Sequence, residues 1–200
     1  KMAILNPLLI SIVFTIAFLV AGHVDYDNYY EGAKYISYLL TPATICLAIP
    51  LYEQFEVLKK NWRAVLIGIV SGVFTSLISV LGISFLFHFS HAEYVTFLPK
   101  SITTAIGMGV SDELGGYVSI TVAAIIITGI LGNICSDFIL KCFHIKEPVA
   151  KGIAIGVSSH AVGTARAMEM GKIEGALSSL SIVVAGIFTV VGASFFAMIW

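Results

Sequence analysis

The sequence predicts an all-α membrane protein: a polytopic bundle of transmembrane helices, with interrupted or re-entrant helices and internal, inverted repeats. Its composition is the first reason, because 58% of the 200 residues are hydrophobic and only 12% are charged, whereas soluble domains average about 25% charged residues. Mean hydropathy is +0.97. The second reason is the spacing of the charges, which separates long apolar runs. The third is a weak internal similarity between parts of the chain.

The same composition excludes several classes of function. A net charge of −1 leaves no basic excess for neutralising phosphates, so we expect no nucleic-acid partner. The chain has no HExxH, GxSxG or P-loop motif and no cysteine–histidine pattern with zinc spacing, so we expect neither an enzyme nor a metal or other cofactor. The expected surroundings are a lipid bilayer.

Uncharged runs locate the expected spans, since crossing a bilayer takes about 20 apolar residues. Five runs are long enough: residues 2–22, 35–52, 64–87, 118–136 and 175–200. Two more, 101–111 and 152–165, are too short and too polar for a standard span.

The charged segments between these runs predict an orientation. Segments 53–63 and 141–151 carry three lysines or arginines each, whereas 23–34 and 87–98 carry at most one. Since positive loops stay in the cytoplasm, we place the first two segments inside and the other two, as loops, outside. With the charged segments on these sides, residues 101–111 cannot form a full span. They must enter and leave the membrane on one side or form half of a broken helix.

Three segments mix Ser or Thr with Gly or Pro at membrane depth: residues 41–50, 99–109 and 156–165. Non-helical backbone survives in a membrane only where protein or a water-filled cavity meets it. We therefore interpret these segments as broken helices that line a site. The alternative is that the prolines only kink a helix and that the hydroxyls bond back to their own backbone.

The internal similarity appears at an offset of 60 residues. Between residues 41–76 and 101–136, six aligned positions are identical. The offset also aligns one threonine and one glycine in all three copies, namely Thr44, Thr104 and Thr164, and Gly72, Gly132 and Gly192. Repeats with interrupted segments at matching positions are typical of transporter binding sites.

The broken helices predict a site for a small carboxylate. Half-helix N–H groups and the helix dipole attract anions, hydroxyls add donors, and a cation completes the site. Arg166 or Lys100 would supply the charge, and His160 is a candidate for proton coupling. The hydroxyl candidates are Thr41, Thr44, Ser101, Thr103, Thr104, Ser159 and Thr164.

Each ionisable candidate also has a structural interpretation. Arg166 could reach the membrane interface and pair with Glu169, three residues later. Lys100 could be an interfacial anchor, and His160 a neutral packing residue. For Asp137 we expect a pair with Lys141, four residues later.

These stretches resemble the LrgB/CidB family of bacterial membrane proteins, often called antiholin-like. The resemblance rests on residues 5–9 (Leu-Asn-Pro-Leu-Leu), 42–52, 98–104, 111–116, 159–169 and 174–179. The most specific stretch is 159–169, Ser-His-Ala-Val-Gly-Thr-Ala-Arg-Ala-Met-Glu. The likeness implies one membrane-embedded domain over residues 1–200, without an N-terminal helix that the family usually carries.

The resemblance implies two functions and assigns no catalytic residue. In the first, which the broken helices also favour, the chain is a secondary transporter of small monocarboxylates such as pyruvate or glycolate. It would lie in the bacterial cytoplasmic membrane and be linked to autolysis; plant chloroplast relatives carry glycolate or glycerate. In the second, it is a non-transporting regulator that acts with a holin-like LrgA/CidA-type membrane protein on murein hydrolase activity and programmed cell death. The spacing of Gly68 and Gly72 permits close helix approach within or between chains, which leaves a homo-oligomer open.

Overall fold

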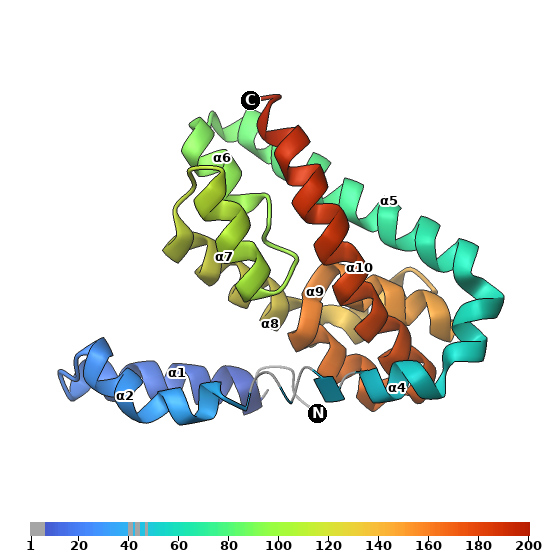
Figure 1. Ribbon diagram of the computed structural model, residues 1–200, viewed down its shortest axis with the longest axis horizontal. Coiled ribbons are helices and arrows are strands. Elements are labelled where there is room, and N and C mark those ends of the chain that lie inside the picture. The colour runs from blue at the N-terminus through green and yellow to red at the C-terminus, as the bar shows by residue number, and fades with distance from the viewer. Residues whose placement is uncertain (1–6, 40–41, 43–44, 47) are drawn as a thin grey trace. The chain divides into compact units, whose positions relative to one another are not determined.

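The computed structural model describes residues 7–39, 42, 45–46 and 48–200, which form helices and turns and no strand (Figure 1). The prediction of an all-α fold is therefore confirmed. Contacts divide the chain into two compact units, Lys1–Ile49 and Pro50–Trp200. The expected single domain stays a prediction.

The first unit contains helices α1 (Pro7–Ala21) and α2 (Tyr26–Ser37). Helix α1 lies in the expected span 2–22, and its apolar side chains are largely exposed. Helix α2 corrects the expectation of a loop over 23–34. The Asp25 side chain caps its start by accepting from the Asp27 N–H at 3.4 Å, and Glu31 pairs with Lys34. Caps and such pairs stabilise a polar helix without an apolar run. The other expected span of this region, 35–52, includes residues outside the described part.

The second unit is built on three long helices, α5 (Phe55–Phe87), α8 (Val118–Cys142) and α10 (Lys172–Ala197). All three are long and apolar enough to cross a membrane, which confirms long apolar helices at the predicted runs 64–87, 118–136 and 175–200. Helix α5 begins earlier than expected because Lys59, Lys60 and Arg63 lie on its first turns instead of in a loop. Each helix exposes large apolar side chains, such as Phe74, Ile127 and Val183, as a lipid-facing surface requires.

Two short helices, α6 (His91–Phe97) and α7 (Thr104–Glu113), lie between α5 and α8, and the short helix α4 (Ala48–Glu53) precedes α5 and crosses the boundary between the two units. At the start of α6, Ser90 and Glu93 form a capping box, with the Ser90 N–H donating to Glu93 at 2.7 Å. These hydrogen bonds lower the pKa of the Glu93 carboxyl. The buried Thr121 hydroxyl of α8 lies 2.9 Å from the Thr96 carbonyl and 2.7 Å from Ser111 Oγ. These contacts join α6 and α7 to α8.

Helix α9 (Pro148–Met170) contacts α5, α8 and α10 and is interrupted at His160. There φ is 42° and ψ is −141°, a conformation that non-glycine residues rarely adopt. The buried His160 ring bonds through Nε2 to the Ile125 carbonyl at 3.0 Å, and the Thr164 hydroxyl donates to the His160 carbonyl at 2.9 Å. The predicted interruption within 156–165 is confirmed, and it separates segments 148–159 and 161–170.

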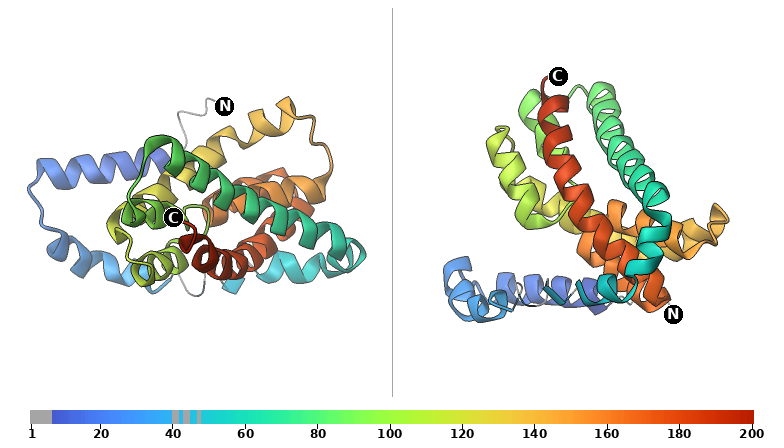
Figure 2. Two further views of the ribbon diagram at one scale, coloured as in Figure 1. Left: turned by 90° about the horizontal axis from the view of Figure 1, so that it is seen from above. Right: turned by 45° about the vertical axis from the view of Figure 1, so that its right-hand side comes forward.

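Helices α5 and α10 converge near the C-terminus and diverge toward their other ends, where α9 packs against both (Figures 1 and 2). At the converging end, the Trp200 indole donates to the Phe89 carbonyl at 2.8 Å. At the diverging end, glycines let the backbones of α9 and α10 approach closely. A Cβ on Gly152 would lie 2.6 Å from the Glu174 carbonyl oxygen, and one on Gly156 would lie 2.5 Å from the Ser178 carbonyl oxygen.

Candidate functional site

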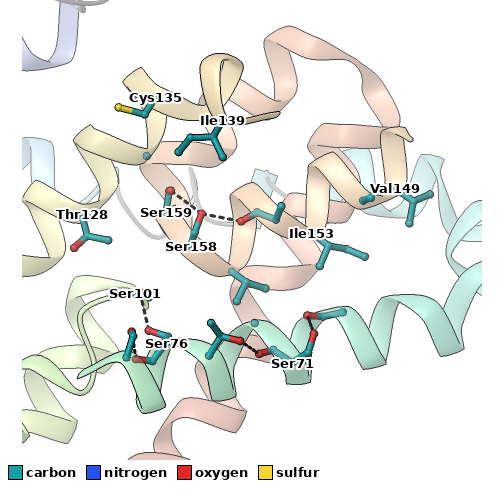
Figure 3. Close-up of a pocket in the computed structure, with 18 of the residues that line it drawn as sticks. Ser71, Ser76, Ser101, Thr128, Cys135, Ile139, Val149, Ile153, Ser158 and Ser159 are labelled. Carbon is teal, nitrogen blue, oxygen red and sulfur yellow. Dashed lines mark hydrogen bonds between the residues drawn. The ribbon is translucent and has the colours of Figure 1, made fainter. Parts of the chain in front are cut away.

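A cavity of about 970 Å³ lies between α5, α8 and α9 and is closed in part by the segment between α6 and α7 (Figure 3). Clefts between helices of a bundle are common ligand sites. Hydroxyl groups dominate the polar part of its lining. The polar side chains among the described lining residues are Asn61, Ser71, Thr75, Ser76, Ser79, Lys100, Ser101, Thr128, Glu147, Ser158 and Ser159.

The α5 wall of the cavity carries hydroxyls at helical spacing. Ser71 donates to the Gly68 carbonyl at 3.0 Å, Thr75 to the Ser71 carbonyl at 2.7 Å, and Ser79 to the Ser76 carbonyl at 2.7 Å. Each proton is thus used by the helix itself, as polar residues in apolar helices often arrange. Because a hydroxyl oxygen also has two lone pairs, this wall can accept hydrogen bonds from a bound molecule.

Lys100 supplies the positive charge at one end of the cavity. Its ammonium donates to Ser101 Oγ at 3.0 Å and to Ser76 Oγ at 3.3 Å, and the two hydroxyl oxygens are 3.1 Å apart (Figure 3). Two of its three donors are thereby used. Among the described residues no carboxylate lies within ion-pair distance of Lys100. A charged group that is withdrawn from water without a counterion favours an anionic ligand.

The α9 side of the cavity ends in two adjacent serines, just before the interruption at His160. Ser158 Oγ lies 2.7 Å from the Ala154 carbonyl and 3.0 Å from Ser159 Oγ (Figure 3). Ser159 is buried against the backbone of α8, where a Cβ on Gly132 would overlap its hydroxyl. The position of this serine pair therefore depends on a glycine in the neighbouring helix.

The structure brings some of the predicted site residues together and separates others. Lys100, Ser101 and Ser159 line the cavity. Thr103 and Thr104, at the start of α7, are half-buried outside its lining. The other predicted residues are not among the lining residues or are not described: His160 and Thr164 are buried in the interruption of α9, Arg166 lies beyond it, and Thr41 and Thr44 fall outside the described residues.

Arg166 has the partners that its structural interpretation requires. It pairs with Glu169 in its own helix and with Asp137 at the end of α8. Asp137 thus pairs with Arg166, and in the described part of the chain no ion pair joins it to the expected Lys141. The guanidinium links segment 161–170 of α9 to α8, and each of its two terminal nitrogens contacts a carboxylate of the chain itself.

We predict that Arg166→Gln lowers stability rather than carboxylate affinity. The double-mutant cycle with Asp137→Asn should give a coupling of about 0.5–1 kcal/mol, because both side chains are partly exposed. Thermal unfolding of the four proteins in detergent measures it. Strictly additive losses, or a carboxylate Kd that rises tenfold in Arg166→Gln alone, would contradict this role.

The α5 wall and Thr128 of α8 were not among the predicted site residues. A signal for the wall was present, because small or hydroxyl-bearing residues recur every three or four positions on one helix face from residue 64 to 79: Ala64, Gly68, Ser71, Gly72, Thr75, Ser76 and Ser79. A small and polar stripe in an apolar helix indicates a face that contacts other helices or a cavity instead of lipid.

Comparisons with known proteins identify relatives over almost the whole chain. The model of the LrgB-like family matches residues 1–199. The antiholin-like protein LrgB of Bacillus cereus strain B4264 is 39% identical over 186 residues, which cover 93% of this chain and 81% of the relative. The protein of the same name from Bacillus anthracis strain CDC 684 matches with the same identity and coverage. No solved structure gives a significant match.

Proposed function

This chain belongs to the LrgB-like family, and we propose that it is a secondary transporter of small organic monocarboxylates, such as pyruvate or glycolate, in the bacterial cytoplasmic membrane. One observation carries the proposal. The Lys100 ammonium lies at a hydroxyl-lined cavity between membrane helices, and no carboxylate of the described chain pairs with it. An anion from outside the chain would complete that site.

The proposed binding mode uses the groups that line the cavity. The substrate carboxylate accepts hydrogen bonds from Lys100 and from whichever hydroxyl of Ser76 and Ser101 does not donate to the other; these hydroxyls lie 3.3 Å and 3.0 Å from the Lys100 ammonium. Charge-assisted hydrogen bonds of this kind are about twice as strong as neutral ones. A single cation suits a monocarboxylate better than a dicarboxylate. Arg166 is not needed in this mode, because two carboxylates already occupy it.

A second candidate is favoured by the names of the relatives, which call them antiholin-like. The chain would then be a non-transporting regulator that binds a holin-like membrane protein and acts on murein hydrolase activity. The exposed apolar side chains of α5, α8 and α10 suit helix–helix contacts with such a partner as well as they suit lipid. This role makes no use of Lys100 or of the cavity.

Uptake into proteoliposomes separates the two functions. Purified protein should accumulate labelled pyruvate or glycolate saturably, above protein-free liposomes, under a pH or a sodium gradient. Absence of uptake of every small monocarboxylate under both gradients contradicts the transporter. If a variant that has lost uptake still binds a holin-like partner and alters murein hydrolase activity, the regulatory role is separate from transport.

A further inference from the structure

A second pocket, of about 410 Å³, lies where α8 turns into α9 and combines several cations. The cations are Lys141, Lys146 and Lys151, and His144 lines the pocket beside them. Its volume is that of a small-molecule site, and its lining residues differ entirely from those of the cavity. The pocket therefore plays no part in the proposed transport site.

The turn between the helices brings these side chains together. After α8 ends at Cys142, the Ile145 N–H returns to the Leu140 carbonyl at 2.8 Å, and His144 adopts a positive φ of 54°. Leu140 packs with Ile155 and Ala167 of α9, and Ile145 packs against this cluster. This apolar base fixes the turn, so that cations from the end of α8, the turn and the first turn of α9 surround one pocket.

The charges of the pocket leave an excess of cations. Two carboxylates also line it, those of Asp137 and Glu174. Arg166 pairs with Asp137. Glu174, which is only 8% exposed, is then the one carboxylate left among the described lining residues, against the three lining lysines. Over the described ranges, none of the three lining lysines forms an ion pair. Lysines bind phosphate as mobile point charges, so a phosphate group fits this excess.

The neighbourhood of the pocket indicates a lipid source for that phosphate. Helix α8 is long and apolar enough to cross a membrane, and the pocket lies at its end. Phe138 and Phe143, beside the pocket residues in sequence, are 73% and 74% exposed. Basic pockets at the ends of spanning helices attract anionic head groups, and exposed apolar side chains next to them can contact acyl chains. We propose that this pocket binds the phosphate group of an anionic phospholipid.

Lipid binding to the full-length chain in detergent tests the proposal. Phosphatidylglycerol should be retained in native mass spectrometry, and phosphatidylcholine, which has no net charge, should be retained at least tenfold less. The variant Lys141→Gln/Lys146→Gln should weaken phosphatidylglycerol binding about tenfold or more. The matched control is Lys59→Gln/Lys60→Gln, which removes two exposed lysines from α5, outside the pocket, and should change binding less than twofold.

Glycerol phosphate, added alone, distinguishes the two sources of the phosphate. Weak binding of glycerol phosphate with tight binding of phosphatidylglycerol supports the lipid. If glycerol phosphate and phosphatidylglycerol bind with equal affinity, and Lys141→Gln/Lys146→Gln loses the binding of both, the pocket recognises the phosphate group of a soluble ligand. The proposal is overturned if neither compound binds, if both lipids bind equally, or if the α5 control loses as much binding as the pocket variant.

Discussion

Lys100→Met should abolish most of the uptake of a small monocarboxylate. Methionine keeps the length and apolar stem of lysine but removes the charge and both hydrogen bonds, to Ser76 and Ser101. Loss of a charge-assisted hydrogen bond costs about 1.5–3 kcal/mol, which corresponds to roughly a 10- to 150-fold loss of affinity. Initial rates of uptake into proteoliposomes, measured against substrate concentration, give the change in apparent KM.

Two further variants decide whether the charge or the fold is responsible. Lys60→Met removes the same charge from an exposed position on α5 outside the cavity lining and should transport normally. Lys100→Arg keeps the charge with a different geometry and should recover part of the uptake. Normal transport by a folded Lys100→Met protein would show that the cavity is not the substrate site. Equal losses in Lys60→Met would assign the effect to surface charge.

The long spans could be predicted because length and hydrophobicity are themselves the requirements for crossing a bilayer. Runs 64–87, 118–136 and 175–200 correspond to α5, α8 and α10. Length and hydrophobicity predicted the ends of the helices poorly. Lys59 and Lys60 indicated a loop, yet a helix that leaves the hydrocarbon can expose charges along its surface, as α5 does. Helix α2 was missed for a similar reason, since its caps and ion pair leave no apolar run.

The position of the interruption in α9 could be predicted, but the residue that adopts the non-helical conformation could not. Gly, Ser and Thr in 156–165 predicted non-helical backbone, but the residue that adopts it is His160. Histidine has no local preference for that conformation. A hydrogen bond to Ile125, 35 residues earlier in the chain, holds it there. Tertiary contacts of this kind select a strained conformation that local sequence does not encode.

The candidate site was predicted in part, for a related reason. Lys100, Ser101 and Ser159 lie within the predicted Gly- or Pro-containing segments 99–109 and 156–165, which mark them. Ser71 and Thr75 lie inside an unbroken apolar run, and their hydroxyls bond to their own helix. Only the arrangement of α8 and α9 across from them makes that face a cavity wall. In the same way, the role of Arg166 depends on Asp137, 29 residues away.

The three glycines aligned by the 60-residue offset share one physical property. Each lies in a long helix at a point where another helix comes too close for a side chain. A Cβ on Gly72 would lie 2.8 Å from Val157, one on Gly192 would lie 2.7 Å from Leu77, and one on Gly132 would overlap the Ser159 hydroxyl. Real Cβ atoms do not approach other atoms this closely. Other helical glycines, such as Gly152 and Gly156, share this property, so it does not by itself support a repeat; of the three aligned glycines, the approach is closest at Gly132.

Gly132→Ala should lower the free energy of unfolding by about 1–3 kcal/mol, the cost of overpacking. Gly82→Ala is the matched control, because nothing lies within 4 Å of a Cβ at that helical position. It should raise stability by about 0.5–1 kcal/mol through helix propensity.

The source of the clash can be tested at Ser159. Ser159→Ala keeps a Cβ at 2.5 Å from the new methyl group, so it should relieve the cost of Gly132→Ala only in part. Ser159→Gly removes both overlapping atoms, so adding Gly132→Ala to it should cost little. Thermal unfolding of these variants in detergent measures the cycle. If Gly132→Ala is as stable as Gly82→Ala, or if its cost is the same with and without the Ser159→Gly substitution, α8 and α9 do not pack at this point as closely as the structure has them.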